Sequence, residues 1–171
     1  MGDFQELKEI EGLEISSVTA DLYGNGRDDL SLFFFKDGAN YASLTTLNSI
    51  VSESLEWNKK SNKKSIKALM VNTKNANTFT GEQGFEGLNI LAKNLAKCLT
   101  IKESKKNEGI SETVKIKDII FASTGVIGEE FPTEKINNSI QNLVDKLREN
   151  QNKLIWVKSA SAIMTTDTKP K

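Results

Sequence analysis

Two stretches of the chain carry apolar residues at spacings of three and four, the period of an amphipathic helix. The first stretch follows Thr80 and Gln83, a pair that predicts a capping box at the helix start. The second follows Thr133, which we expect to cap it, and ends near Asn150. The apolar positions are Phe85, Leu88, Leu91, Leu95 and Leu99 in the first helix, and Ile136, Ile140, Leu143 and Leu147 in the second.

Shorter apolar runs predict strands in the rest of the sequence. Turn signals at 23–26 and at Asp37-Gly38 separate the first three runs and predict a meander. The second run, Leu-Ser-Leu-Phe-Phe-Phe, is too apolar for a strand with one wet face, which predicts cover on both of its faces. The five predicted strands are 10–20, 30–35, 41–46, 66–71 and 114–121.

The remaining segments complete the predicted order of elements. A weakly periodic stretch at 50–57 predicts a short helix, and the charged stretch 102–113 predicts an exposed connection. The segment 156–164 is dense in serine and alanine, which permit close packing against a sheet or helix. This order predicts an α+β or α/β fold with antiparallel hairpins at its start.

Length and charge narrow the class of protein. We expect residues 1–171 (18.9 kDa) to form a single domain with a core of its own. The 23 basic and 23 acidic residues cancel, which argues against nucleic acid or an anionic membrane as partner, because phosphate binding needs clustered cations. The sequence shows neither a signal peptide nor an apolar run of spanning length, so we expect a soluble, cytoplasmic protein.

Histidine is absent from the sequence, and Cys98 is its one cysteine. A Ser/His or Cys/His catalytic pair and the usual zinc sites are therefore excluded within this chain, and we expect no metal. Cys98 falls on an apolar helical stretch, where a buried thiol is the ordinary outcome. Disulfide bonds play no part in this design, which suits the cytosol.

The residues Ser123 to Gly128 form a corner between a predicted strand and a predicted helix. Gly125 and Gly128 allow positive φ and leave backbone amides without ladder partners. The Thr124 hydroxyl beside the Gly125 amide can form an oxyanion hole, in which two donors converge on an oxygen that gains charge. An ordinary glycine turn explains the same residues without any chemistry.

Two further segments offer polar groups to a ligand. The loop 72–81 contains Asn75 and Asn77, whose amides can hold a loop or a substrate, although a turn that caps itself is the alternative. The run 165–168, Thr-Thr-Asp-Thr, can present hydroxyls to a ligand or form a simple exit turn. The local sequence does not decide between these alternatives.

Three separated motifs together resemble the amino-terminal half of the ornithine acetyltransferase family, the bifunctional glutamate N-acetyltransferases of arginine biosynthesis. They are VNTKNANTFTGEQG at 71–84, STGVIGE at 123–129 and AIMTTDTKPK at 162–171. The segment GRDDLSLFFF at 26–35 is also similar to an early strand of the family. Departures occur at Thr73-Lys74, where many members have Ala-Gly or Ser-Gly, and at 44–51, which lacks the family's proline.

The resemblance implies a self-cleaving precursor whose β chain begins with a nucleophilic threonine, with this sequence as the α chain of an α2β2 heterotetramer. It implies an α+β fold, a layered αββα sandwich like that of N-terminal-nucleophile enzymes, completed by the β chain. An unpaired α chain should then expose a large apolar surface. The implied reaction is ping-pong transfer of acetyl from N2-acetylornithine to glutamate, without a cofactor, although some members also accept acetyl-CoA as a substrate.

Carried over by position, the resemblance makes Thr124 and Gly125 the oxyanion pair, Thr166 a substrate contact, and Asn75 and Asn77 parts of an active-site loop. The missing histidine is consistent with this chemistry, because an N-terminal threonine can use its own α-amine as base. Two alternatives stay open: a related self-processing aminopeptidase or amidase, in which water accepts the acyl group, and a non-catalytic interaction domain that kept only the fold.

Overall fold

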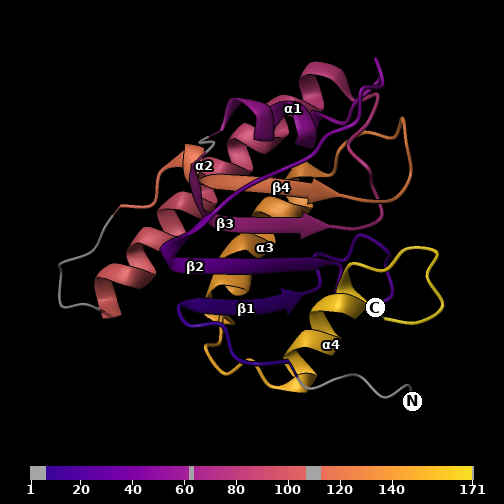
Figure 1. Cartoon of the computed structure of the whole chain (residues 1–171). Helices are drawn as coiled ribbons and strands as arrows, with labels where there is room; N and C mark the ends of the chain where they lie inside the picture. Colours follow the sequence, from indigo (N-terminus) through magenta and orange to yellow (C-terminus); the bar gives the residue numbers. More distant parts are fainter. Residues whose placement is uncertain (1–6, 62–63, 107–112, 171) are drawn as a thin grey trace.

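A mixed four-stranded sheet in the order β1-β2-β3-β4 is the centre of the computed structural model, which describes residues 7–61, 64–106 and 113–170 (Figure 1). The outer strand β1 pairs antiparallel with β2, and β2 pairs antiparallel with β3. The last strand, β4, runs parallel to β3. The strands are β1 Leu13–Val18, β2 Leu30–Asn40, β3 Ser65–Asn72 and β4 Ile119–Ser123.

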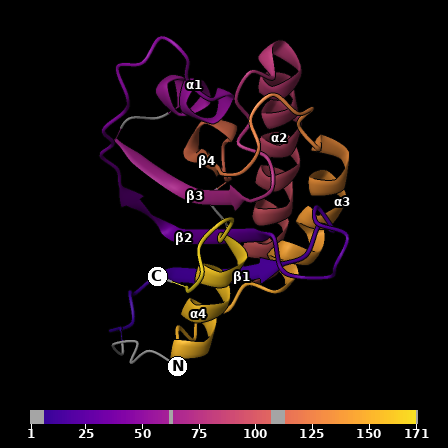
Figure 2. The same ribbon diagram turned by 90° about the vertical axis from the view of Figure 1, so that its right-hand side faces the viewer.

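Helices lie on both faces of the sheet (Figure 2). The long helix α2 (Gly81–Lys106) and α3 (Thr133–Asp145) pack against each other and cover one face. Helix α4 (Lys153–Ala162) lies on the other face against β1 and β2, and α1 (Glu53–Lys60) packs beside β4 and α2. A mixed sheet with helices confirms the α+β prediction. The described residues form one sheet, so the second sheet of the expected αββα sandwich stays a prediction.

The apolar stripes of the two predicted helices form the main core. The stripe residues of the two predicted helices are buried, except Phe85, which is partly buried and packs against the core; β2 residues Leu30, Leu32 and Phe34 are buried with them. On the opposite face of β2, Phe33 packs against Trp156 of α4 with ring centroids 6.3 Å apart. Strand β2 is therefore covered on both faces, as its continuous apolar run predicted.

The predicted strand at 41–46 is wrong, and so is the turn at Asp37-Gly38 before it. Strand β2 continues to Asn40, and a register shift between Phe34 and Ala39 takes up Gly38, whose φ is 80°. A β-bulge of this kind lets the strand go on pairing with β3 instead of turning back. The residues that follow have no strand partner, and Leu44 and Leu47 are fully exposed.

The boundaries of the later elements also differ from prediction. The run 114–121 begins with a 3-10 turn at Ile116–Asp118, so β4 starts only at Ile119. Helix α3 ends at Asp145, several residues before Asn150. Helix α2 continues to Lys106 through part of the predicted exposed connection, of which residues 107–112 lie outside the described residues.

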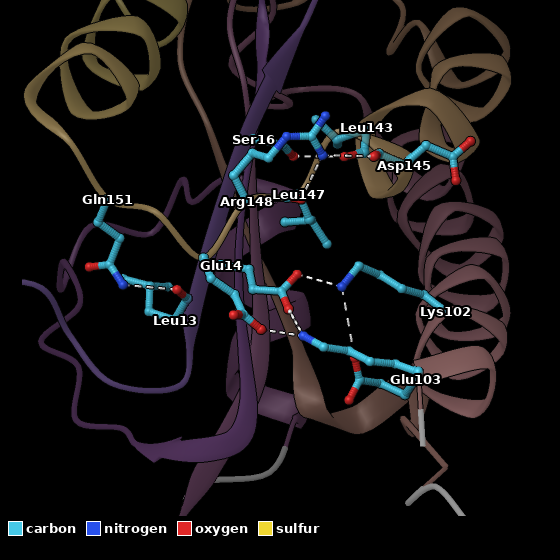
Figure 3. Close-up of polar contacts among 12 residues, drawn as sticks. Leu13, Glu14, Ser16, Lys102, Glu103, Leu143, Asp145, Leu147, Arg148 and Gln151 are labelled. Carbon is cyan, nitrogen blue, oxygen red and sulfur yellow. Dashed lines mark hydrogen bonds and ion pairs between the residues drawn. The ribbon is translucent and has the colours of Figure 1, made fainter. Parts of the chain in front are cut away.

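A buried carboxylate explains the length of α2 (Figure 3). Glu14 of β1 is 1% exposed, and its two oxygens pair with Lys102 and, at 3.2 Å, with Lys106. A buried charge needs such partners, because an unpaired one is costly in a low-dielectric interior. The last turns of α2 therefore lie against β1 and do not form a solvated loop.

Candidate active site

The carboxyl ends of the parallel strands β3 and β4 bring two of the sequence motifs together. The loops that leave these strands pair with each other as a short continuation of the sheet, with Asn75 bridging Val126. The Thr124 amide donates to the Asn72 carbonyl at 3.1 Å, and the Val126 amide donates to the Lys74 carbonyl at 2.9 Å. We call residues 72–81 the asparagine loop and residues 123–128 the Thr-Gly corner. The two segments form one structure, although they are some 50 positions apart in the sequence.

Gly125 is where the two loops approach most closely. Its φ is 139°, and a Cβ atom there would lie 2.2 Å from the carbonyl carbon of Lys74. Only glycine combines that backbone conformation with that contact. The corner therefore requires Gly125 for its shape, and this requirement holds whether or not the corner is catalytic.

The corner leaves two hydrogen-bond donors available beside each other. The Thr124 amide is used by Asn72, but neither the Thr124 hydroxyl nor the Gly125 amide donates to another residue in the described part of the chain. Thr124 is half-buried and Gly125 is exposed. A hydroxyl and an amide held on a rigid turn and open to a ligand are the groups that an oxyanion hole needs.

Asn75 and Asn77 hold the loop together and do not offer their amides to a ligand. Asn75 is 2% exposed; its Nδ2 donates to the carbonyls of Glu129 and Glu130, both at 3.1 Å, and its Oδ1 accepts from the Asn77 amide at 2.7 Å. Asn77 is fully buried and accepts from the Thr80 hydroxyl at 2.6 Å. The structure gives both residues a supporting role under the corner.

The predicted helix caps are wrong because their side chains find partners elsewhere. Gln83 does not form a capping box. Its Nε2 donates to the Phe131 carbonyl at 3.0 Å, and its Oε1 accepts from the Phe131 amide at 3.1 Å. The N-cap of α3 is Pro132, and the Thr133 hydroxyl donates to the Phe131 carbonyl. Gln83 thus holds the end of the corner loop against α2, and Thr133 makes a local bond at the start of α3.

The resemblance assigned only Asn75 and Asn77 to the active-site loop, but Asn72 is the residue that links the two loops. Its Oδ1 accepts from the Ser123 hydroxyl at 2.7 Å, and its Nδ2 donates to the Asn75 carbonyl at 2.9 Å. The Ser123 hydroxyl also lies 2.8 Å from that of Ser54 in α1. A buried asparagine at the end of a strand, next to a loop with two more, was the available signal.

Backbone strain concentrates in the same loop. Lys74, Asn77 and Phe79 have φ values of 73°, 48° and 58°, and among the described non-glycine residues only Asp21 shares this conformation. The left-handed conformation at Lys74 is one that glycine adopts without steric cost and that a side chain with a Cβ adopts with strain. Strain of this kind persists where the surrounding contacts over-determine the backbone, and it clusters at functional sites.

Thr166 lies on the exposed segment after α4. Figure 1 shows this segment and the loop that follows β4 on the same side of the molecule, the side to which the arrows of β3 and β4 point. The segment begins at a surface hollow of about 430 Å³ that Arg27, Met164, Thr165 and Asp167 help to line. The structure thus places all three motifs on one side of the molecule. It shows contacts between the first two motifs and places the third apart from them.

Asp29, in the connection between β1 and β2, supports the asparagine loop. It is buried, and its carboxylate accepts from the amides of Ala20 at 2.6 Å and Leu22 at 2.7 Å. Burial raises the pKa of Asp29, and the two backbone hydrogen bonds oppose that effect. Its carbonyl accepts from the amide of Thr73 at 3.0 Å, which attaches the β1–β2 connection to the asparagine loop.

No group of three or more histidine, cysteine, aspartate or glutamate residues with the geometry to hold a metal occurs within 7–61, 64–106 and 113–170. In the same ranges, no helix is both long and apolar enough to cross a membrane.

Replacing Asn75 with alanine should destabilise the folded protein by about 3 kcal/mol, because the buried Asn77 amide and the carbonyls of Glu129 and Glu130 lose their partner. Urea unfolding followed by tryptophan fluorescence measures the change. Asn89, whose side chain pairs with Glu86 on the surface of α2, is the matched control, and its alanine variant should differ by no more than about 0.5 kcal/mol. Equal losses in both variants would contradict the supporting role.

Comparison with known proteins gives a consistent result. The model of the ArgJ family matches residues 14–171. The arginine biosynthesis bifunctional protein ArgJ of Pseudomonas fluorescens is 32% identical over the whole chain, and that of Nitrobacter winogradskyi is 33% identical over 99% of it. The chain spans 38% of the length of each of these relatives.

Solved structures agree with the sequence comparison. Ornithine acetyltransferase of Mycobacterium tuberculosis, solved in complex with ornithine, has a TM-score of 0.78 at 25% identity, covering 92% of this chain and 78% of the matched chain. The ArgJ protein of Bacillus halodurans has the same TM-score at 23% identity and supports the fold. The resemblance seen in the three motifs is confirmed: this chain belongs to the ArgJ family.

Proposed function

We propose that this chain is the α part of an acetyltransferase that moves acetyl from N2-acetylornithine to glutamate in arginine biosynthesis. The observation that carries the proposal is the Thr124-Gly125 corner, with two available donors side by side on a turn that both loops hold rigid. The relatives named bifunctional ArgJ and ornithine acetyltransferase support the assignment to this reaction.

In the proposed reaction, the threonine at the start of a separate β chain attacks the acetyl carbonyl of N2-acetylornithine. Its α-amine takes the hydroxyl proton, and the carbonyl oxygen becomes an oxyanion. The Thr124 hydroxyl and the Gly125 amide donate hydrogen bonds to that oxygen as its charge grows. Collapse expels ornithine, which takes the proton, and leaves an acetyl ester on the threonine. The amine of glutamate then attacks the ester through a second oxyanion, and the bond between the acetyl carbon and the threonine oxygen breaks. The proton lost by the amine passes through the α-amine to the threonine oxygen, which restores the hydroxyl as N-acetylglutamate leaves.

Chain lengths support a β-chain partner. This chain covers 38% of the curated P. fluorescens relative but 78% of the matched chain in the M. tuberculosis structure. A solved chain so much shorter than a full-length relative is what a precursor split into two polypeptides gives. Apolar side chains beside the corner support a partner on this side, since Phe79 and Ile127 are 65% and 60% exposed.

The proposal extends to the features that the resemblance implied. We assign Thr166 a contact with the substrate, the assembly an α2β2 composition, and the reaction a cytoplasmic location. We propose no cofactor, and acetyl-CoA enters only as a second acetyl donor. The exposure of Thr166, on a segment that lies on the same side of the molecule as the corner loop (Figure 1), supports its assignment.

The test is to supply the full-length protein with N2-acetylornithine labelled in the acetyl group, with and without glutamate. A transferase yields labelled N-acetylglutamate, and its turnover with glutamate greatly exceeds acetate release without it. Labelled acetate at the same rate under both conditions would establish an amidase instead. No product in either condition, from material in which both chains are present, would favour the interaction domain.

A further inference from the structure

The run Arg27-Asp28-Asp29 in the β1–β2 connection has no part in the chemistry described above, yet it contacts two segments of the candidate site. The guanidinium of Arg27 reaches the end of α4, where Nη2 donates to the Ser161 carbonyl at 3.0 Å and to the Met164 carbonyl at 2.8 Å. The Ser161 carbonyl, in the last turn of α4, also accepts from the Met164 amide at 3.3 Å, and Met164 lies two residues beyond the helix. A cation at a helix C-terminus meets the negative end of the helix dipole. The Met164 carbonyl lies two positions before Thr166.

The Arg27 guanidinium is itself held in place. It lies over the ring of Tyr23, 4.6 Å from the centroid, and its Nε donates to the carbonyl of Asp28 at 3.4 Å. The Asp28 carboxylate accepts from the Ser17 hydroxyl of β1 at 3.0 Å and lies 3.8 Å from Lys158 Nζ of α4. An arginine oriented by its neighbours loses less side-chain freedom for each hydrogen bond it makes.

The same run reaches the other segment of the site two residues later. The Asp29 carbonyl accepts from both the amide and the hydroxyl of Thr73, at 3.0 and 3.3 Å, at the start of the asparagine loop. That loop pairs directly with the Thr124-Gly125 corner. Residues 27–29 therefore contact the asparagine loop, which supports the corner, and also the start of the segment that carries Thr166.

We propose that Arg27 is a positioning residue for substrate binding: it sets the place of Thr166 relative to the oxyanion corner by holding the carbonyls of Ser161 and Met164. The inference rests on the proposed function, because the role of Thr166 as a substrate contact belongs to it. Arg27 does not touch the reacting atoms, so its loss affects the binding of N2-acetylornithine more than the chemical step.

The first experiment measures KM and kcat for N2-acetylornithine with the full-length protein and its Arg27→Gln variant. Losing charge-assisted bonds to two carbonyls should raise KM about tenfold while kcat changes less than about threefold. Arg27→Lys keeps the charge but not the planar fork, so its KM should lie between the two. Lys135→Gln is the matched control, since Lys135 donates to the Asp21 carbonyl of the same connection, away from α4, and its KM should equal that of the wild type.

A double-mutant cycle separates positioning from general damage. If Arg27 acts through Thr166, then Arg27→Gln should raise KM much less in a Thr166→Ala background than in the wild type. Additive effects, or an unchanged KM in Arg27→Gln, would overturn the proposal.

Hydrogen exchange gives a readout that does not depend on activity. The amides of residues 163–168 should exchange faster in Arg27→Gln than in the wild type or in Lys135→Gln, because the segment loses both hydrogen bonds from Arg27. Unchanged exchange overturns the inference even in an active enzyme. A wild-type protein that transfers no acetyl refutes the proposed function, while the exchange data still decide whether Arg27 holds the segment.

Discussion

Replacing Thr124 with alanine should lower kcat for the proposed acetyl transfer by about 10²- to 10³-fold, the usual effect of removing one oxyanion donor. The change removes the hydroxyl but leaves the Thr124 amide, which pairs with the Asn72 carbonyl at 3.1 Å and holds the corner in shape. The donor is therefore lost without loss of the turn. Unfolding by urea should show stability within about 0.5 kcal/mol of the wild type, because the hydroxyl makes no bond within the described residues.

The conservative variant Thr124→Ser is the control for this experiment. It keeps a hydroxyl in the same place and should retain most of the activity, whereas Thr124→Ala and Thr124→Val should not. Steady-state assays of labelled acetyl transfer measure all three. Alanine and serine variants with equal kcat would show that the hydroxyl is not a donor to the oxyanion.

Replacing Gly125 with alanine should cost about 3 kcal/mol or more in stability and abolish transfer. A Cβ at this position would lie 2.2 Å from the Lys74 carbonyl carbon and 2.6 Å from the Asn75 amide nitrogen, and both are backbone atoms. A backbone contact cannot be relieved by a change of rotamer, so the two loops must separate. The φ of 139° adds strain of about 1 to 3 kcal/mol for any residue with a side chain.

Gly128 on the same corner is the matched control for Gly125. Its φ is 80°, but an added Cβ would have no neighbour within 4 Å. Gly128→Ala should therefore cost only about 1 kcal/mol, from backbone strain alone. Denaturant melts and transfer assays on both variants test the difference, and a similar loss in the two would mean that the close approach of the loops is not what Gly125 provides.

The parts of the fold that could be predicted are those with local causes. The stripes of α2 and α3 follow from helical spacing, and the residues that define them are buried as expected, except Phe85, which is partly buried. The strand at 41–46 failed because tyrosine and threonine favour strands only where a neighbouring strand is available. The bulge at Gly38 keeps β2 on its partner β3, and the following segment is left without one.

The end of α2 was missed because its cause is distant in sequence. Lys102 looks like part of a charged linker until Glu14, 88 positions earlier, is placed beside it as a buried carboxylate. The caps failed for the same reason. Gln83 has a good local role available, but the Phe131 backbone, 48 positions away, takes its side chain instead.

The sequence allowed the donor residues of the candidate site to be predicted, but not the contacts that hold them in place. Thr124 and Gly125 could be selected because a hydroxyl beside a glycine amide has a clear chemical use. The support under them depends on pairing between loops, as in the two bonds from Asn75 to the Glu129 and Glu130 carbonyls. Arg27 was not predicted because its partners are backbone carbonyls more than 130 positions away. Every residue has such a carbonyl, so the sequence does not distinguish the two that Arg27 binds.

The central claim is that this chain supplies oxyanion donors to a threonine on a second chain. The most direct measurement is intact-mass analysis of both chains after brief reaction of the full-length protein with N2-acetylornithine and no glutamate. The account predicts one acetyl group on the N-terminal threonine of the β chain, none on the α chain, and acetylation slowed at least about 100-fold in Thr124→Ala. Acetyl on the α chain, or acetylation of the β chain at the wild-type rate in Thr124→Ala, would contradict it.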